Sequence, residues 1–280
     1  MMYSKEQITR MLFLDIETAR ATQNFQELSE GMQKMWEYKS QNLEPKEATA
    51  EEKYYERAAI YAEFGRIVCI SCGFIYEKNE QLYFRVKSFF GENEKQILTE
   101  FKEFLDKKAG KIDGYGNLID KNGKRIFDTN GNKLSNEWLF HYLVAHNGKE
   151  FDFPYLCRRY MVNQLALPEA LEIRGKKPWD IQHLIDTMEL WRFGDIKNFT
   201  KLELLCHLFE IPTPKDDIDG SMVSRVFWEE KNFDRIAKYC EKDVVATAQL
   251  MLKFNLFDIF PQENVVYSEK NAYANTITIN

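Results

Sequence analysis

Two acidic residues end an apolar run near the start of the chain. The stretch RMLFLDIETA, residues 10–19, is typical of a buried strand, and Asp15 and Glu17 stand two positions apart within it. Side chains at positions i and i+2 of a strand point to the same face. Two carboxylates held this close repel each other unless a cation or a shared proton lies between them. The spacing therefore indicates a cation site or a proton-sharing pair at the end of this strand.

Two later segments also carry polar residues where apolar elements begin or end. Asp152, in AHNGKEFDFPYL, precedes a predicted helix and could simply be its N-cap, a position that aspartate favours. In YCEKDVVATAQL, Tyr239 and Asp243 are four residues apart, so they share one face of a helix. Taken alone, that pair could be a partly exposed helix face. The three segments in this order form a much more specific pattern than any one of them.

The elements that must position these residues are strands followed by interleaved helices, which is typical of a mixed α/β sheet domain. Apolar runs predict further strands over residues 66–76, 81–90 and 138–145. Apolar residues at helical spacing predict helices over residues 92–108, 152–165 and 233–254.

Two insertions interrupt this pattern. Residues 20–63 are polar and helical in pattern, and the capping-box spacing of Thr49 and Glu52 marks a helix start, so we expect a helical arm. Residues 110–134 contain two Asn-Gly pairs, which are hairpin-turn signals. Their Asp and Asn content suggests calcium, but the ligand spacing of an EF-hand is not met, and a small β-meander is the preferred interpretation. Residues 1–260 would then form a single domain and residues 261–280 a C-terminal tail.

Composition limits the class of protein. The chain of 280 residues has a net charge of -6, so it cannot hold duplex nucleic acid by overall charge, and any such contact must be local or made through bound cations. No run of about 18 apolar residues predicts a membrane span, no signal-peptide core is evident, and the expected location is cytoplasmic. The CxxC pair Cys69 and Cys72 lies inside an apolar run, which favours buried strand residues over a redox or zinc site.

Together, the three segments resemble the DEDD superfamily of 3′–5′ exonucleases, in its tyrosine-containing (DEDDy) branch. The resemblance rests on DIET (15–18), HNGKEFDFP (146–154) and YCEKD (239–243). It is closest to the proofreading exonuclease domain of family-B DNA polymerases and its stand-alone bacterial relatives, and KDDIDGSMV (215–223) is similar to a feature of that stand-alone group. The resemblance implies an α/β, ribonuclease H-like fold: a central mixed β-sheet flanked by helices, with the arm and the meander inserted.

The resemblance also implies a metal-dependent 3′–5′ exonuclease with a two-metal-ion mechanism. The two divalent ions, Mg²⁺ or Mn²⁺, prefer carboxylate oxygens, and they would activate a water and stabilise the leaving 3′ oxygen. By likeness to the family, Asp15 would bridge both ions, and Glu17 and Asp243 would complete the first site. Asp152 would hold the second ion, in part through water. Tyr239 would orient the attacking water, because a phenol with a pKa of about 10 is a poor general base.

Candidate substrate contacts come from the same segments. Asn147 is expected to touch substrate, although Asn147 and Gly148 could simply form a turn. The backbone near Thr18 is expected to receive the 3′-terminal nucleotide. Phe151 could stack on a base, which every base permits, although Phe151 and Phe153 could both be core residues.

Basic residues near these motifs are candidates for phosphate contact. Arg158 and Arg159 follow Asp152 on its predicted helix. A second cluster lies on a predicted loop and comprises Arg174, Lys176 and Lys177. A charge cluster on a loop is usually a solvated surface, so that alternative stays open for the second group.

The expected substrate is nucleic acid, preferentially single-stranded DNA or DNA 3′ ends. One alternative is a 3′–5′ exoribonuclease or oligoribonuclease that uses the same site. A second alternative is a non-catalytic nucleic-acid-binding module, but the presence of all four carboxylates and the tyrosine disfavours it. Of the neighbouring polar residues, His146 is expected to be structural, and Asp186 either an additional acid near the metals or, preferably, a capping carboxylate.

Overall fold

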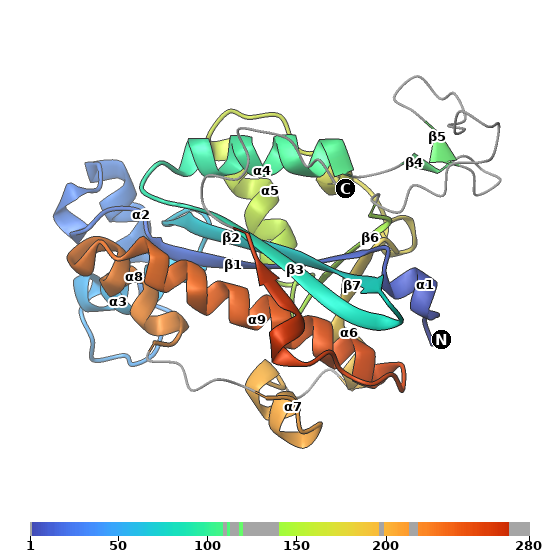
Figure 1. Ribbon diagram of the computed structural model, residues 1–280. Coiled ribbons are helices and arrows are strands. Elements are labelled where there is room, and N and C mark those ends of the chain that lie inside the picture. Colours follow the sequence, from blue (N-terminus) through green and yellow to red (C-terminus); the bar gives the residue numbers. More distant parts are fainter. Residues whose placement is uncertain are drawn as a thin grey trace.

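The apolar run that ends in two acids forms strand β1 (Met11–Arg20), which lies inside a mixed sheet. The computed structural model describes residues 2–108, 111–112, 118–119, 140–195, 199–212 and 218–268. Within these residues, one six-stranded sheet has the order β7-β6-β1-β2-β3-β8 (Figure 1). Its other strands are β2 (Gly65–Lys78), β3 (Gln81–Phe90), β6 (Tyr142–Ala145), β7 (Leu184–Asp186) and β8 (Val265–Tyr267).

Strand direction changes across the sheet. β1 pairs antiparallel with β2, and β2 pairs antiparallel with β3 as a hairpin. β6 lies parallel to β1, β7 parallel to β6, and β8 parallel to β3. Parallel neighbours require long connections, and helices supply most of these crossovers.

The alternation of side chains along β1 assigns each face of the sheet to different helices. Leu12, Leu14 and Ile16 belong to the core beneath α4 (Glu94–Lys108) and α5 (Asp152–Val162). Met11 and Phe13 belong to the core beneath α9 (Phe233–Phe254). Figure 1 shows α9 on the opposite face of the sheet from α4 and α5. Since Asp15 and Glu17 continue the odd-numbered series, they face α9.

The inserted arm contains α2 (Glu30–Ser40) and α3 (Ala50–Arg57), and the predicted capping box of Thr49 and Glu52 begins α3. A separate small core fills the arm: Trp36 is fully buried against Tyr54, and its indole N–H donates to the Ala50 carbonyl at 2.7 Å. Of the predicted meander, the structure describes only the antiparallel pair β4 (Lys111–Ile112) and β5 (Leu118–Ile119), and the rest lies outside the described residues.

Two short strands form the edges of the sheet. Leu184–Asp186, a segment for which the sequence pattern predicts no element, forms β7 at one edge. Val265–Tyr267 forms β8 at the other edge, so the sheet continues into the predicted tail, 261–280. Both segments have three residues, too few for an alternating pattern to stand out, and their pairing with a neighbour stabilises them as strands. Residues 269–280 lie outside the described part.

Short helical elements complete the connections. They are α1 (Lys5–Ile8), α6 (Thr187–Arg192), α7 (Leu202–Leu208), α8 (Val223–Arg225), a π-helical segment η6 (Val226–Glu230) and the 3-10 turns η1 (Phe25–Glu27), η2 (Ala58–Ile60), η3 (Glu169–Leu171), η4 (Pro178–Asp180), η5 (Gly220–Met222) and η7 (Gln262–Asn264). None of the helices in the described ranges is both long and apolar enough to cross a membrane. The architecture is the predicted α/β one, a mixed sheet flanked by helices, and is consistent with a ribonuclease H-like exonuclease fold.

Candidate active site

The site lies where β1 loses a neighbour on one side. β6 pairs with β1 only from Met11 to Phe13, the last pair being Phe13 with Val144, and β6 ends one residue later, at Ala145. Beyond that point, the backbone N–H of Ile16 donates instead to the Asp152 carboxylate, at 3.1 Å, from the first turn of α5. A buried backbone donor needs a partner, and Asp152 supplies it in place of the missing strand. Asp152 is therefore held directly beside the β1 segment that carries Asp15 and Glu17.

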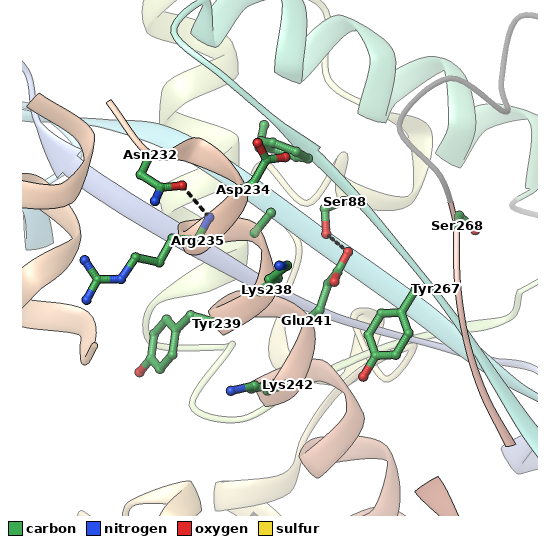
Figure 2. Close-up of a pocket in the computed structure, with 12 residues that line it drawn as sticks. Ser88, Asn232, Asp234, Arg235, Lys238, Tyr239, Glu241, Lys242, Tyr267 and Ser268 are labelled. Carbon is green, nitrogen blue, oxygen red and sulfur yellow. Dashed lines mark hydrogen bonds between the residues drawn. The ribbon is translucent and has the colours of Figure 1, made fainter. Parts of the chain in front are cut away.

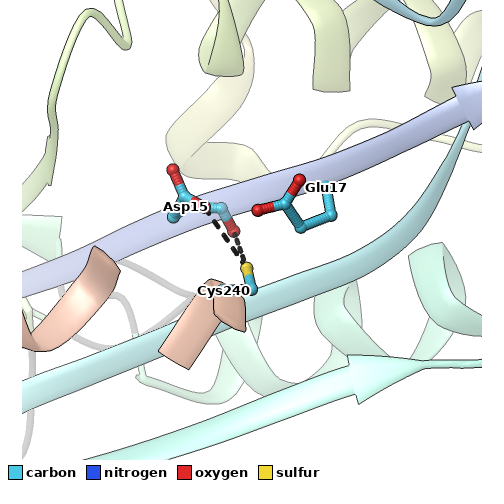
Figure 3. A group of neighbouring side chains, drawn as sticks. All are labelled: Asp15, Glu17 and Cys240. Carbon is cyan, nitrogen blue, oxygen red and sulfur yellow. Dashed lines mark hydrogen bonds between the residues drawn. The ribbon is translucent and has the colours of Figure 1, made fainter. Parts of the chain in front are cut away.

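The carboxylates of Asp15 and Glu17 lie side by side, as the strand spacing predicts. Together with the Cys240 thiol from α9, they place three potential ligand atoms within 4.8 Å of one another (Figure 3). The thiol sulfur lies 3.3 Å from Asp15 Oδ2 and 3.4 Å from the Asp15 carbonyl oxygen, so its single proton can be donated to either oxygen. Glu17 is only 7% exposed, whereas Asp15 is partly exposed.

Mutual repulsion connects all four predicted acids. Burial, followed by the charges of Asp152 and Asp243, raises the pKa of Asp15 well above its ordinary value. Burial, followed by the charges of Asp15 and Asp243, does the same to the pKa of Glu17. Asp243 lies on α9, three residues after Cys240. The four carboxyl groups thus converge from β1, α5 and α9 on one location.

Asp152 is buried and held by two backbone donors. It is 2% exposed, and burial raises its pKa to about 7, with smaller contributions from the negative charges of Asp186 and Asp243. Hydrogen bonds from its own backbone N–H and from that of Ile16 act in the opposite direction, because they favour the charged form. Burial therefore outweighs these donors, and the pKa of the free carboxyl lies well above its ordinary value.

The donor set fits a divalent cation. Within the described residues, no Lys or Arg makes a salt bridge with Asp15, Glu17 or Asp152. Hard ions such as Mg²⁺ and Mn²⁺ bind carboxylate oxygens and favour deprotonated acids. A cation among these groups would offset the repulsion that raises their pKa values, so the cluster suits a bound cation, one of the two alternatives that the spacing along β1 predicts.

Tyr239 lies one helical turn before Asp243 on α9, on the side of the helix away from Glu241 (Figure 2). It is half-buried against the core beneath the first half of α9. It also lines a pocket of about 710 Å³ that extends over the outer face of α9 to Ser88 and Tyr267. Tyr239 thus borders both this pocket and the helix face that carries Asp243.

The segment between β6 and α5 makes a sharp turn at Asn147 and Gly148. This agrees with the alternative in which these two residues form a turn. Asn147 has a positive φ of 62°, and a Cβ on Gly148 would lie 2.4 Å from the Ala145 methyl, so only glycine fits there. The turn does not exclude the substrate alternative. Asn147 Oδ1 is a buried side-chain oxygen without a hydrogen-bond partner among the described residues, so its capacity to accept a hydrogen bond is unused there.

Asp186 and His146 support this turn, and both are structural as expected. Asp186 ends β7 and caps α6, since its carboxylate accepts from the backbone N–H groups of Met188 and Glu189. The same carboxylate also accepts from Asn147 N at 2.9 Å and Lys149 N at 3.0 Å. The two ring nitrogens of His146 contact Thr187 Oγ1 and the Thr200 carbonyl, each at 2.9 Å. Both side chains therefore hold loops around the acids.

One predicted substrate contact is wrong. Arg159 is 8% exposed, its guanidinium forms a bidentate pair with Glu94 at 2.8 and 2.6 Å, and it donates to the Ala62 carbonyl at 2.7 Å. Its donors hold α5 against α4 and the end of the arm and are not available to phosphate. Arg158, the preceding residue, is exposed. The helix turns by 100° per residue, which sends these neighbours to different environments.

The remaining predicted contacts differ in their exposure. Phe153 is fully buried in the core, whereas Phe151 is half-buried beside the Tyr155 ring, with centroids 5.3 Å apart. Thr18 is buried and its hydroxyl interacts with Tyr155, so the predicted contact of its backbone with substrate stays a prediction. The loop residue Arg174 pairs with Glu172, which is consistent with the solvated-surface alternative.

Cys240 is the site residue that sequence reasoning missed. Its position between Tyr239 and Asp243 was the available signal, because a residue three positions before Asp243 lies close to it on a helix. The CxxC residues are buried thiols as predicted, and they face opposite sides of β2: Cys72 lies in the core beneath α4 and α5, and Cys69 beneath α9. A spacing of three along a strand separates side chains in this way, which excludes a CxxC pair with both thiols on one face.

Comparison with known proteins identifies the class that the fold and the acids define. The sequence profile of a protein family matches residues 135–277 and is described as a predicted 3′–5′ exonuclease related to the exonuclease domain of PolB. The matched residues include Asp152, Tyr239 and Asp243. Since this match covers half of the sequence, the chain belongs to that family of predicted PolB-related 3′–5′ exonucleases.

A solved structure similar to the chain is that of the family B DNA polymerase from the hyperthermophilic archaeon Pyrobaculum calidifontis. The match has a TM-score of 0.49 and a sequence identity of 14%, and it covers 87% of this chain. The chain spans 24% of the length of that polymerase chain.

Proposed function

We propose that this protein is a metal-dependent 3′–5′ exonuclease of the DEDDy type, formed by a single ribonuclease H-like domain. The observation that carries the proposal is the convergence of Asp15, Glu17 and Asp152, with no salt bridge from Lys or Arg in the described part of the chain, on the helix that carries Asp243. Buried carboxylates that raise one another's pKa are expected at sites built for a cation.

Each acid has a separate role in this proposal. Asp15, whose carboxylate lies within 4.8 Å of the ligand atoms of Glu17 and Cys240, would help to hold both of two divalent ions, Mg²⁺ or Mn²⁺. Glu17 and Asp243 would contribute to the first ion and Asp152 to the second. When bound, the ions supply activation of a water and stabilisation of negative charge on the leaving oxygen.

The reaction is hydrolysis of the terminal phosphodiester. Water adds to the phosphorus, the bond from phosphorus to the 3′ oxygen of the preceding nucleotide breaks, and that oxygen takes up a proton. The terminal nucleotide leaves as a 5′-monophosphate. Tyr239 orients the water by a hydrogen bond, which its place one turn before Asp243 on a solvent-facing side of α9 supports.

Single-stranded DNA with a free 3′ end is the proposed substrate. Asn147 Oδ1, which lacks an internal partner among the described residues, accepts a hydrogen bond from the terminal nucleotide. Phe151, half-buried at the start of α5, stacks on a base, and the backbone at Thr18 contacts the 3′ end. Arg158 is exposed on α5 and contacts phosphate. A single strand suits such contacts because it presents unpaired bases for stacking.

A degradation assay tests the proposal. We would compare 5′-labelled single-stranded DNA and RNA of matched sequence, with Mg²⁺, Mn²⁺ or EDTA. The expected result is a ladder that shortens from the 3′ end of DNA, requires the metal, and is lost in Asp15→Ala but kept in Asp258→Asn, which alters an exposed acid after α9. Faster cleavage of RNA would replace the DNA assignment by an exoribonuclease. Failure to cleave either polymer would overturn the proposed activity in favour of a binding module.

Tyr239→Phe tests the assignment to the tyrosine branch. It removes only the hydroxyl, so we expect the rate of cleavage to fall by about 100-fold, within the range for a positioned hydrogen-bonding group, while metal binding is retained. An unchanged rate would remove Tyr239 from the mechanism.

A further inference from the structure

The Cys240 thiol occupies an unusual place for a buried cysteine. Cys240 is fully buried on α9, and its Sγ lies 3.3 Å from Asp15 Oδ2 and 3.4 Å from the Asp15 carbonyl oxygen (Figure 3). It therefore contacts both the side chain and the backbone of one residue. A cysteine that only filled the core would have apolar neighbours at these positions.

The contact constrains a torsion that the strand leaves free. The terminal torsion of an aspartate side chain is broad, so β1 alone does not determine which way the two oxygens of Asp15 point. A donor on Oδ2 selects one orientation and leaves Oδ1 available to other ligands. The thiol is uncharged and a weak donor, so it can orient the carboxylate without neutralising it.

A row of small polar side chains lies behind this contact, on the same face of the sheet. Ser71 on β2 is opposite Asp15, and Ser88 on β3 is opposite Ser71. The two serine hydroxyls are 2.7 Å apart, and Ser88 donates to Glu241 Oε1 at 2.6 Å (Figure 2). Glu241 follows Cys240 on α9, so consecutive residues of the helix bind polar groups on β1 and on β3.

Cys69 connects the Cys240 thiol to the two serines of this row. It is opposite Glu17 in the β1–β2 register, and its thiol lies 3.6 Å from Ser71 Oγ. It is also a hydrogen-bond neighbour of Cys240. The polar row thus continues from Asp15 through both thiols and both serines to Glu241. Such a row restricts the rotation of α9 about its axis, because a rotation would break the contacts at Cys240 and Glu241 together.

We propose that Cys240 is a positioning residue that holds Oδ2 of Asp15 so that Oδ1 faces the divalent cation, and that the row Cys69–Ser71–Ser88–Glu241 keeps α9 in the rotation that this requires. This inference rests on the proposed metal-dependent function. It assigns Cys240 no contact with substrate.

Substitutions separate this role from simple packing. Cys240→Ala removes the donor and some volume, Cys240→Val fills the volume without a donor, and Cys240→Ser keeps a donor. Cys72→Ala is the matched control, since Cys72 is equally buried on β2 but belongs to the core on the other face of the sheet. Ser88→Ala tests the far end of the row.

The experiment measures Mn²⁺ binding by calorimetry on each full-length variant, together with kcat and KM on single-stranded DNA and the unfolding temperature. Partners that orient metal ligands typically contribute 10–100-fold, and a thiol is a weak donor, so we expect Cys240→Ala and Cys240→Val to weaken Mn²⁺ binding by about tenfold. We expect kcat to fall at low Mn²⁺ with KM for DNA unchanged. Cys240→Ser should recover most of the affinity, Ser88→Ala should show a smaller loss, and Cys72→Ala should lower only the unfolding temperature.

Mn²⁺ affinity in Cys240→Ala equal to that of the wild type, or equal losses in Cys240→Ser and Cys240→Ala, would overturn the positioning role. Either result could occur in a fully active nuclease, so it would leave the proposed function intact. A wild-type protein that neither binds Mn²⁺ nor shortens DNA would instead refute the proposed function, and the positioning role with it.

Discussion

Asp152→Asn is expected to inactivate the protein and, at the same time, to stabilise its metal-free form. Asp152 is buried, and its carboxylate accepts the Ile16 N–H at 3.1 Å. An asparagine oxygen can accept the same bond, so the local structure of β1 and α5 is kept. What the substitution removes is a buried negative charge beside those of Asp186 and Asp243.

The size of the effect follows from the pKa of Asp152, which is raised from 3.8 to about 7. Between these values the folded state holds a proton that the unfolded chain has released. The contribution of Asp152 to the free energy of unfolding is therefore fully present below about pH 4 and is lost as the pH rises through about 7. At 1.36 kcal/mol per pKa unit, the charge costs at most about 4 kcal/mol at alkaline pH. Asparagine has no such cost, and its advantage grows by about 2–3 kcal/mol from about pH 5 to about pH 8.

Urea unfolding in EDTA at these two pH values measures the difference, with Asp258→Asn as the control for an exposed carboxylate. Mn²⁺ should stabilise the wild type but Asp152→Asn much less, and nuclease activity should fall by more than about 100-fold because a proposed metal ligand is lost. A variant that is less stable than the wild type at about pH 8 without metal, or whose advantage does not grow with pH, would refute the reasoning that Asp152 is repelled by its neighbours.

Three further predictions follow from single side chains. Asp15→Ala should abolish cleavage but leave the unfolding temperature in EDTA unchanged or higher, because it relieves carboxylate repulsion; a large decrease would contradict this. Arg159→Met should cost about 3–5 kcal/mol in urea unfolding by leaving the buried Glu94 charge without its cation. Adding Glu94→Gln, which removes that charge but keeps an acceptor for the Ile67 N–H, should recover much of the loss, whereas additive losses would disprove the pairing. Gly148→Ala places a methyl 2.4 Å from Ala145, so thermal unfolding should show a loss of about 1–3 kcal/mol, and full stability would show that the turn can relax.

Much of the site could be predicted because its spacing is local. The period of two along β1 places Asp15 beside Glu17, and the helical period of α9 places Tyr239 one turn before Asp243. The apolar residues that alternate with the two acids assign them to one face of the sheet. The spacing of Asp15 and Glu17 places them on one face of any strand, and the spacing of Tyr239 and Asp243 places them on one face of any helix, whatever these elements pack against.

Other features could not be predicted because they depend on partners far away in the sequence. Arg158 and Arg159 are chemically alike and adjacent, and only the position of Glu94, 65 residues before Arg159, makes one of them structural. β7 is a strand because β6 lies beside it, and its three residues carry no period of their own. The sequence alone does not show that Glu94 lies beside Arg159 or that β6 lies beside β7.

The local sequence therefore determined which residues share a face: the two acids of β1, and the tyrosine and acid of α9. Tertiary structure alone decided which faces meet. Cys240 contacts Asp15 across 225 residues of chain, and Asp152 takes the Ile16 N–H across 136. The reason is that periodicity orients side chains relative to their own backbone, whereas contact between elements depends on how the whole core packs.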